Sequence, residues 1–106
     1  FDAASNQVFT EAVSAATRAL IDAPVPVIAS IRGFCIGGGV VVASACDIRI
    51  CSDDAVFGVP AARLGLGYEA ENMARLVSIV GRGAAMDLTA TARQIRAEEA
   101  LRLGFV

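Results

Sequence analysis

Three consecutive glycines at residues 37–39 separate two apolar stretches, at residues 25–31 and 40–46. The first stretch is β-branched and continuously apolar, which is typical of a strand covered on both faces. By residue propensity the second stretch fits a strand or a helix. We favour a helix, because a glycine turn that leads from a strand directly into a helix is the simplest way for the chain to continue. Such a helix start leaves N–H groups unpaired beside residues that lack a Cβ, so a negatively charged oxygen can approach the backbone there.

The glycine cluster alone does not establish a site. A tight turn with close helix packing explains three glycines better than ligand binding does when nothing else is considered. The pattern is neither the GxGxxG of dinucleotide-binding proteins nor a phosphate-binding P-loop, because no Lys-Ser/Thr pair follows. Phosphate binding is therefore disfavoured, and the surrounding residues have to decide what the glycines do.

The remaining pattern alternates helices and strands. Apolar residues at helical spacing predict a helix over residues 5–23, between a Ser5 cap and Pro24. A short helix is expected to begin at Pro60. Further helices are predicted over residues 69–80, 83–90 and 97–103, and strands over residues 47–51 and 55–58. These alternating elements in a chain of 106 residues predict an α/β class with one hydrophobic core.

Composition excludes several functions. The chain has no His and no Lys, which excludes a Ser-His or Cys-His nucleophile pair and a Schiff base within it. A net charge of −2 without a basic block disfavours nucleic-acid binding. No apolar run reaches the roughly 18 residues that a membrane span needs. Cys35, Cys46 and Cys51 lack CxxC spacing, so we expect buried, reduced thiols in a cytoplasmic protein and no metal site.

The chain also carries more apolar residues than a free-standing domain of its size needs. Its apolar fraction is 56%. We therefore expect that much of its surface is covered, either by the rest of a longer polypeptide or by neighbouring subunits. The opening residues show no start signal, and residues 105–106 stand where a strand is expected to begin, which favours a piece of a longer chain.

A series of ordered motifs surrounds the glycine cluster. It consists of PVIASIRGFCIGGG at residues 26–39, SACDIR at 44–49, AVFGVP at 55–60, RLG at 63–65, RL at 75–76 and AEEALRLGFV at 97–106. In this order and spacing the motifs resemble the crotonase (enoyl-CoA hydratase/isomerase) superfamily. The resemblance implies a crotonase-like (ClpP/crotonase) ββα-spiral core, of which residues 1–106 are the central part. The N-terminal strands and the C-terminal trimerisation helices of that single domain are expected outside this chain.

The resemblance also implies a substrate and a mechanism. Members of the family bind acyl-CoA thioesters and stabilise an enolate-like intermediate with two backbone N–H groups. The middle glycine of the run, Gly38, corresponds to one donor, and the second is expected from an earlier A-G-x-D-like loop that precedes Phe1. Coenzyme A arrives as part of the substrate, so no separate cofactor is expected. We expect the substrate-binding positions to be Gly37, Gly38, Phe57, Pro60, Arg63 and Tyr68.

The sequence departs from the family at the two catalytic carboxylates. The positions that carry glutamate in the hydratases are occupied by Val41 and Ala61, which cannot move a proton. Efficient hydration by the usual pair is therefore not expected. We hypothesise that Glu69, and as a second choice Glu71, acts as a relocated acid or base. The alternative is that both are solvated first-turn residues favoured by the helix dipole.

Two further charged residues are considered for the site. Arg63 lies near the place of the missing glutamate, so it is expected either to pair with Glu69 or Glu71 or to bind an acidic acyl group. Asp47 belongs to the family's C-D-I segment, and we expect it to hold the fold together.

Two functions remain open from the sequence. The first is a lyase or isomerase of fatty acid metabolism, of the enoyl-CoA hydratase/isomerase type, that uses non-standard acid–base groups. The second is a catalytically silent acyl-CoA-binding or assembly subunit of the same fold. Either is expected to assemble as a homotrimer or hexamer, as the relatives do.

Overall fold

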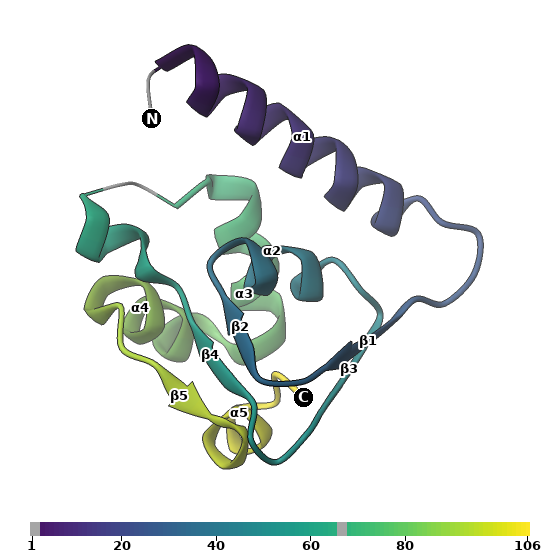
Figure 1. Ribbon diagram of the computed structural model, residues 1–106. Coiled ribbons are helices and arrows are strands. Elements are labelled where there is room, and N and C mark those ends of the chain that lie inside the picture. The colour runs from purple at the N-terminus through teal and green to yellow at the C-terminus, as the bar shows by residue number, and fades with distance from the viewer. Residues whose placement is uncertain (1–2, 66–67) are drawn as a thin grey trace.

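A computed structural model describes residues 3–65 and 68–106 of the chain. It is an α/β structure (Figure 1). The helices are α1 (Ala3–Ile21), α2 (Gly38–Ser44), α3 (Ala70–Val80), α4 (Arg82–Thr91), α5 (Ala97–Leu103) and the 3-10 helix η1 (Pro60–Leu64). The strands are β1 (Ile28–Ile31), β2 (Phe34–Ile36), β3 (Ile48–Cys51), β4 (Val56–Gly58) and β5 (Ile95–Arg96).

The strands form two small sheets that share one repeated pattern. In the first sheet β1 pairs with β3 in parallel, and in the second β2 pairs with β4 in parallel. Strand β5 joins the second sheet antiparallel to β4. The chain runs through β1, β2 and α2, and then through β3, β4, η1 and α3, so each pass adds one strand to each sheet. This is the ββα spiral that the sequence implies.

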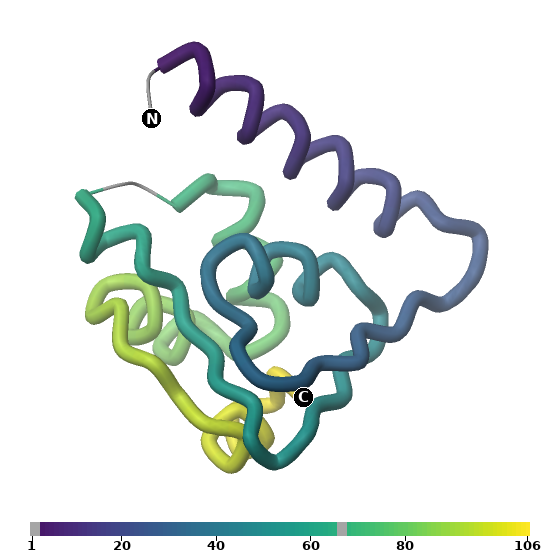
Figure 2. Tube along the Cα trace, viewed as in Figure 1, coloured from purple at the N-terminus to yellow at the C-terminus, as the bar shows by residue number. Residues whose placement is uncertain are grey.

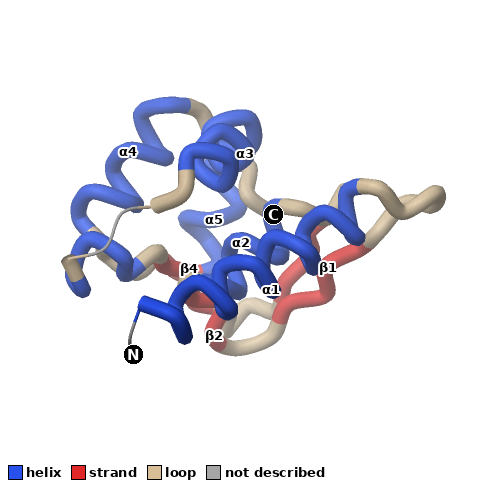
Figure 3. Tube along the Cα trace, turned by 90° about the horizontal axis from the view of Figure 1, so that it is seen from above, coloured by secondary structure: helices blue, strands red, loops and turns tan. Residues whose placement is uncertain are grey.

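Helix α1 lies on one side of the molecule and packs against α2 (Figures 1 and 3). An extended segment leads from its end to β1, as the trace in Figure 2 shows. Thr17 is the buried residue of α1, whereas Val8 and Phe9 are 67% and 55% exposed. The apolar face of α1 is thus largely uncovered within this chain.

The hydrophobic core lies where the second sheet meets α2, α3, α4 and α5. Leu76 of α3 is 1% exposed, and Phe57 of β4 packs edge-to-face on Phe105 with ring centroids 5.3 Å apart. Other members of this core are Val40, Val59, Leu88 and Ile95.

Two polar residues connect distant parts of the fold. The Asp47 carboxylate accepts a hydrogen bond of 2.7 Å from the N–H of Val27, beside the start of the β1–β3 pair. This agrees with the fold-holding role expected for Asp47. Arg49 of β3 donates from Nε to the carbonyl of Phe105 at 2.7 Å and lies 5.5 Å from that ring centroid, so it holds the C-terminal end beside β3 (Figure 2).

Most of the predicted elements are confirmed, with shifts of one to three residues at their ends. The strand predicted over residues 25–31 is shorter, and one of its faces is uncovered, since Ile28 is 58% exposed. Two strands were missed, β2 and β5. Residues 105–106 do not form the expected strand, and Cys51 is partly exposed while Cys35 and Cys46 are buried.

None of the helices in the described part of the chain combines the length and apolarity needed to cross a membrane.

Candidate functional site

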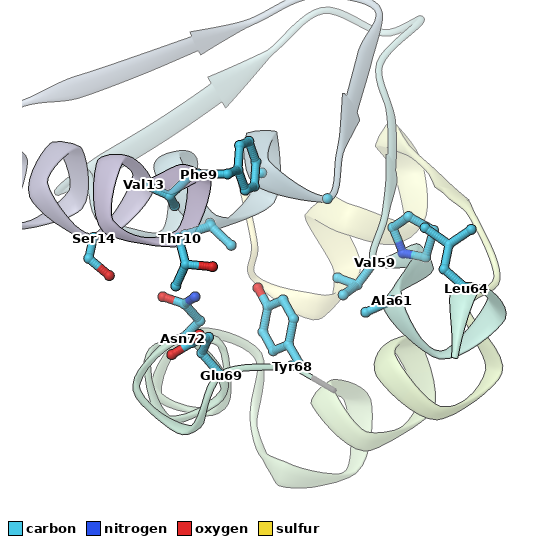
Figure 4. A pocket seen from close by; sticks show the side chains of 14 residues that line it. Phe9, Thr10, Val13, Ser14, Val59, Ala61, Leu64, Tyr68, Glu69 and Asn72 are labelled. Carbon is cyan, nitrogen blue, oxygen red and sulfur yellow. The ribbon is translucent and has the colours of Figure 1, made fainter. Parts of the chain in front are cut away.

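A cavity of about 270 Å³ opens between α1, the glycine turn, η1 and the start of α3 (Figure 4). Four segments that are far apart in sequence supply its walls. Its lining residues are Phe9, Thr10, Val13 and Ser14 of α1; Gly37, Gly38 and Val41 of the glycine turn and α2; Val59, Pro60, Ala61 and Leu64; and Tyr68, Glu69 and Asn72.

The glycine turn is held in a conformation that only glycine adopts readily. Gly37 has φ of 59° and ψ of −114°, and its N–H donates to the carbonyl of Gly58 at 2.8 Å. Helix α2 then begins at Gly38. Within the described residues, no backbone oxygen accepts a hydrogen bond from the N–H of Gly38. An unpaired donor therefore stands at the cavity, on the residue predicted from the sequence to be an oxyanion donor.

Space beside the Cα of Gly38 is open. A Cβ built on Gly38 would meet no heavy atom within 4 Å outside its own helix, whereas one built on Gly39 would meet Cys35 Sγ at 3.5 Å. A ligand atom can therefore approach the backbone at Gly38, whereas a side chain at Gly39, which is itself exposed, would contact Cys35.

Val41 and Ala61 both line the cavity. They come from α2 and η1, respectively. A carboxylate at either position would face the cavity, but both side chains here are apolar. This part of the wall therefore cannot exchange protons with a ligand.

The structure separates the two candidate carboxylates. Glu69 precedes α3 as its N-cap residue and lines the cavity, and it is the one carboxylate among the described lining residues. Glu71 is not among them, and its carboxylate pairs with Arg75 at 2.8 Å and Arg18 at 3.4 Å. Of the two, Glu69 alone is placed to reach a ligand in the cavity.

Tyr68 contributes a buried hydroxyl to the same site. Its oxygen has no hydrogen-bond partner among the described residues. Burial raises the pKa of Tyr68 to about 12, although the nearby Arg75 charge opposes the shift. The group therefore stays protonated at physiological pH and can donate a hydrogen bond.

Two other predicted binding residues lie away from the cavity. Phe57 is 3% exposed and packs on Phe105 in the core, because the alternation of β4 directs it inward. Arg63 is exposed and donates to the carbonyl of Ala92 at 3.4 Å, and it forms no ion pair with Glu69 or Glu71 among the described residues. Gly37 and Pro60, by contrast, line the cavity as predicted.

Sequence reasoning missed the polar residues Thr10 and Asn72. A signal was available for each. Thr10, Ser14 and Thr17 recur at helical spacing along α1, and Asn72 lies in the first turn of α3, three residues after the N-cap residue Glu69. No group of three metal-ligating side chains occurs in the described ranges.

Comparison with known proteins agrees with this fold. The sequence model of the family described as enoyl-CoA hydratase/isomerase matches residues 2–106. A peroxisomal Δ(3,5)-Δ(2,4)-dienoyl-CoA isomerase of Arabidopsis thaliana is 45% identical over 96 residues, which are 91% of this chain and 34% of that protein.

Solved structures give the same result. An enoyl-CoA hydratase/isomerase family protein from Hyphomonas neptunium superimposes with a TM-score of 0.95 at 38% identity, over 99% of this chain and 40% of that one. An enoyl-CoA hydratase from Thermoplasma volcanium superimposes with a TM-score of 0.91 at 36% identity, over 100% of this chain and 43% of that one. The chain thus spans well under half the length of these relatives. The family match extends over nearly the whole chain, so the chain belongs to the enoyl-CoA hydratase/isomerase (crotonase) family.

Proposed function

We propose that the full protein moves a double bond along the acyl chain of an unsaturated acyl-CoA, with Glu69 as its proton carrier. The thioester oxygen takes the enolate charge at the N–H of Gly38, and a second donor comes from outside this chain. The single observation that carries the proposal is that Glu69 is the one carboxylate among the described residues lining the cavity of Gly38.

The glycine turn supplies the electrostatic part of the reaction. Hydrogen-bond donors fixed at the place where negative charge develops stabilise the transition state without having to reorient. The unpaired N–H of Gly38 is held in place by the bond between Gly37 and Gly58. Loss of one such donor typically lowers kcat by about 10²–10³.

A single carboxylate is sufficient for the proton transfer of this reaction. Glu69 removes a proton from a carbon of the acyl chain, and the electron pair passes into the thioester to form the enolate. The same proton then returns to another carbon of the conjugated system, so the double bond moves and no atom is gained. Hydration would also require a group that activates water, and Val41 and Ala61 lack one. The curated relative named as a dienoyl-CoA isomerase supports the same class of reaction.

The test compares Glu69→Gln with its near neighbour Glu71→Gln in the full-length protein. A 3,5-dienoyl-CoA is supplied, and formation of the conjugated 2,4-dienoyl thioester is followed by ultraviolet absorbance. Glu69→Gln is expected to lower turnover by about 10²–10⁴, the usual contribution of a positioned acid or base. Glu71→Gln should stay within about twofold of wild type, because its carboxylate is engaged by Arg75 and Arg18.

The same assay in ¹⁸O-labelled water separates isomerisation from hydration, since only a hydrated product takes up the label. Equal loss in both variants would contradict the assignment of Glu69. Absence of turnover in wild-type protein that still binds acyl-CoA would identify the silent subunit instead.

A further inference from the structure

One wall of the cavity carries polar groups that the proposed reaction does not use. The Tyr68 hydroxyl is buried and unpartnered among the described residues, as noted above. A buried hydroxyl without a partner is unfavourable, and a ligand that supplies an acceptor recovers the lost hydrogen bond. Tyr68 stays protonated at ordinary pH, so its hydroxyl can donate a hydrogen bond to such an acceptor.

Asn72 adds a second donor whose orientation is fixed by its neighbours. Its side-chain oxygen accepts a hydrogen bond of 3.1 Å from Arg75, which is itself held by Glu71 at 2.8 Å. Arginine can only donate, so the amide oxygen must be the atom that faces it. The NH₂ group of Asn72 is therefore the end left for the cavity, which Asn72 lines.

The donors gather on one side of the cavity. Figure 4 shows the hydroxyl end of Tyr68 turned inward, with Thr10 and Asn72 on one side of it and Val59 and Ala61 on the other. A plain hydrocarbon chain would satisfy the apolar side and leave the donors unpaired. A chain that carries an oxygen atom would satisfy both.

We propose that Tyr68 and Asn72 form a donor wall that recognises an oxygen atom on the acyl group, so that the preferred substrates are hydroxy- or oxo-acyl thioesters. This inference rests on the proposed function, because it assumes that an acyl-CoA occupies the cavity of Gly38. The shared chemistry is an acceptor oxygen on the acyl chain beyond the thioester.

A rival role for the same donors is to hold the carboxylate of Glu69, which lies next to Tyr68 in sequence and three residues before Asn72. The two roles differ in what they affect. Donors to Glu69 would change the turnover of every acyl chain equally. Donors to a substrate oxygen would change the affinity for oxygenated chains only.

The experiment measures binding of saturated thioesters to full-length protein by calorimetry. The probes are hexanoyl-CoA and a set of derivatives in which one methylene after another carries a keto or hydroxyl group. Wild-type protein is expected to bind at least one derivative about three- to tenfold more tightly than hexanoyl-CoA, because one or two net hydrogen bonds increase the affinity by about that factor. Tyr68→Phe should remove most of that preference and leave the affinity for hexanoyl-CoA unchanged.

Two further variants keep the result unambiguous. Asn72→Asp replaces the donor with an acceptor while Arg75 keeps its partner, so it should weaken binding of the same derivative and spare hexanoyl-CoA. Ser78→Ala removes a hydroxyl of α3 that lies outside the cavity lining and should leave the preference intact.

The possible failures are distinguishable. Equal affinity of wild-type protein for plain and oxygenated chains, with normal dienoyl turnover, would overturn the donor wall and leave the proposed function standing. A Tyr68→Phe protein that loses dienoyl turnover and keeps its preference would assign the donors to Glu69 instead. Absence of binding to any thioester would overturn both proposals.

Discussion

The N–H of Gly37 donates a hydrogen bond of 2.8 Å to the carbonyl oxygen of Gly58. This bond ties the turn before α2 to the last residue of β4, and it uses the amide that precedes Gly38. The next amide along the chain, that of Gly38, is then the first one left unpaired at the cavity. The position of the candidate oxyanion donor thus depends on a contact between two passes of the spiral.

Replacing Gly38 tests this donor directly. Gly38 is the first residue of α2, where proline is tolerated, so Gly38→Pro removes the N–H with little strain in the helix. Gly38→Ala adds a side chain in the same open space but keeps the N–H. Steady-state kinetics of the full-length protein should show the Pro variant about 10²–10³ slower in kcat than the Ala variant. Similar rates in the two variants would remove Gly38 from the mechanism.

The conformation of Gly37 predicts an effect on stability. An Ala at Gly37 would have to adopt a positive φ of 59°, so Gly37→Ala should lower the free energy of unfolding by about 1–3 kcal/mol. Gly39→Ala is the matched control, since Gly39 is helical and its added Cβ makes an ordinary contact with Cys35. Urea denaturation of full-length variants measures both, and the control should be neutral or slightly stabilising. An equal loss in both would show that crowding at the turn, rather than φ, sets the cost.

Arg49 is expected to be sensitive even to a conservative change. Its guanidinium donates to the carbonyls of Phe105 at 2.7 Å and Cys46 at 2.8 Å, a fork that an ammonium cannot reproduce. Arg49→Lys should therefore destabilise the protein by about 1–3 kcal/mol in thermal or urea unfolding. The control is Arg102→Lys, whose side chain is 72% exposed, and it should leave stability unchanged. A neutral Arg49→Lys would contradict the tethering role.

The ion pairs of Arg93 predict that the stability of the protein depends on pH. Its guanidinium contacts Asp87 and Glu99 at 2.7 Å each, and these hydrogen bonds hold the pKa of both carboxyls below their usual range. A depressed pKa in the folded state stabilises the fold above the unfolded pKa and loses that contribution as pH falls through the folded value. Arg93→Gln should thus be destabilised near neutral pH, and the difference should shrink below about pH 4. A difference that is constant from neutral pH to pH 3 would contradict this account.

How far the sequence predicts the fold depends on whether a signal is local. The helices and the strands β3 and β4 carry periodic patterns, and they were predicted. Strand β2 has three residues between Gly33 and Gly37, too few for a period, and it exists because it pairs with β4, which is remote in sequence. Strand β5 has two residues and depends on β4 in the same way.

How far the sequence predicts the site also depends on whether the signal is local. The motif order predicted Gly38 as a donor and Val41 and Ala61 as the positions of two absent glutamates, and the structure brings these three residues to one cavity. The motif order could not exclude Phe57 from the binding site, because the direction of a side chain from a three-residue strand depends on which face the rest of the chain covers. Nor could it predict that Glu71 would be engaged by Arg18, since that contact joins residues 53 positions apart.

We propose that a thioester oxygen binds the N–H of Gly38 while Glu69 faces the acyl chain. A crystal structure of the full-length protein with a bound saturated acyl-CoA measures this most directly. The account predicts a distance of about 2.7–3.1 Å between the thioester oxygen and the Gly38 nitrogen, with the Glu69 carboxylate against the carbons beside it. A thioester bound elsewhere, or a Gly38 N–H occupied by an acceptor of the protein itself, would contradict it.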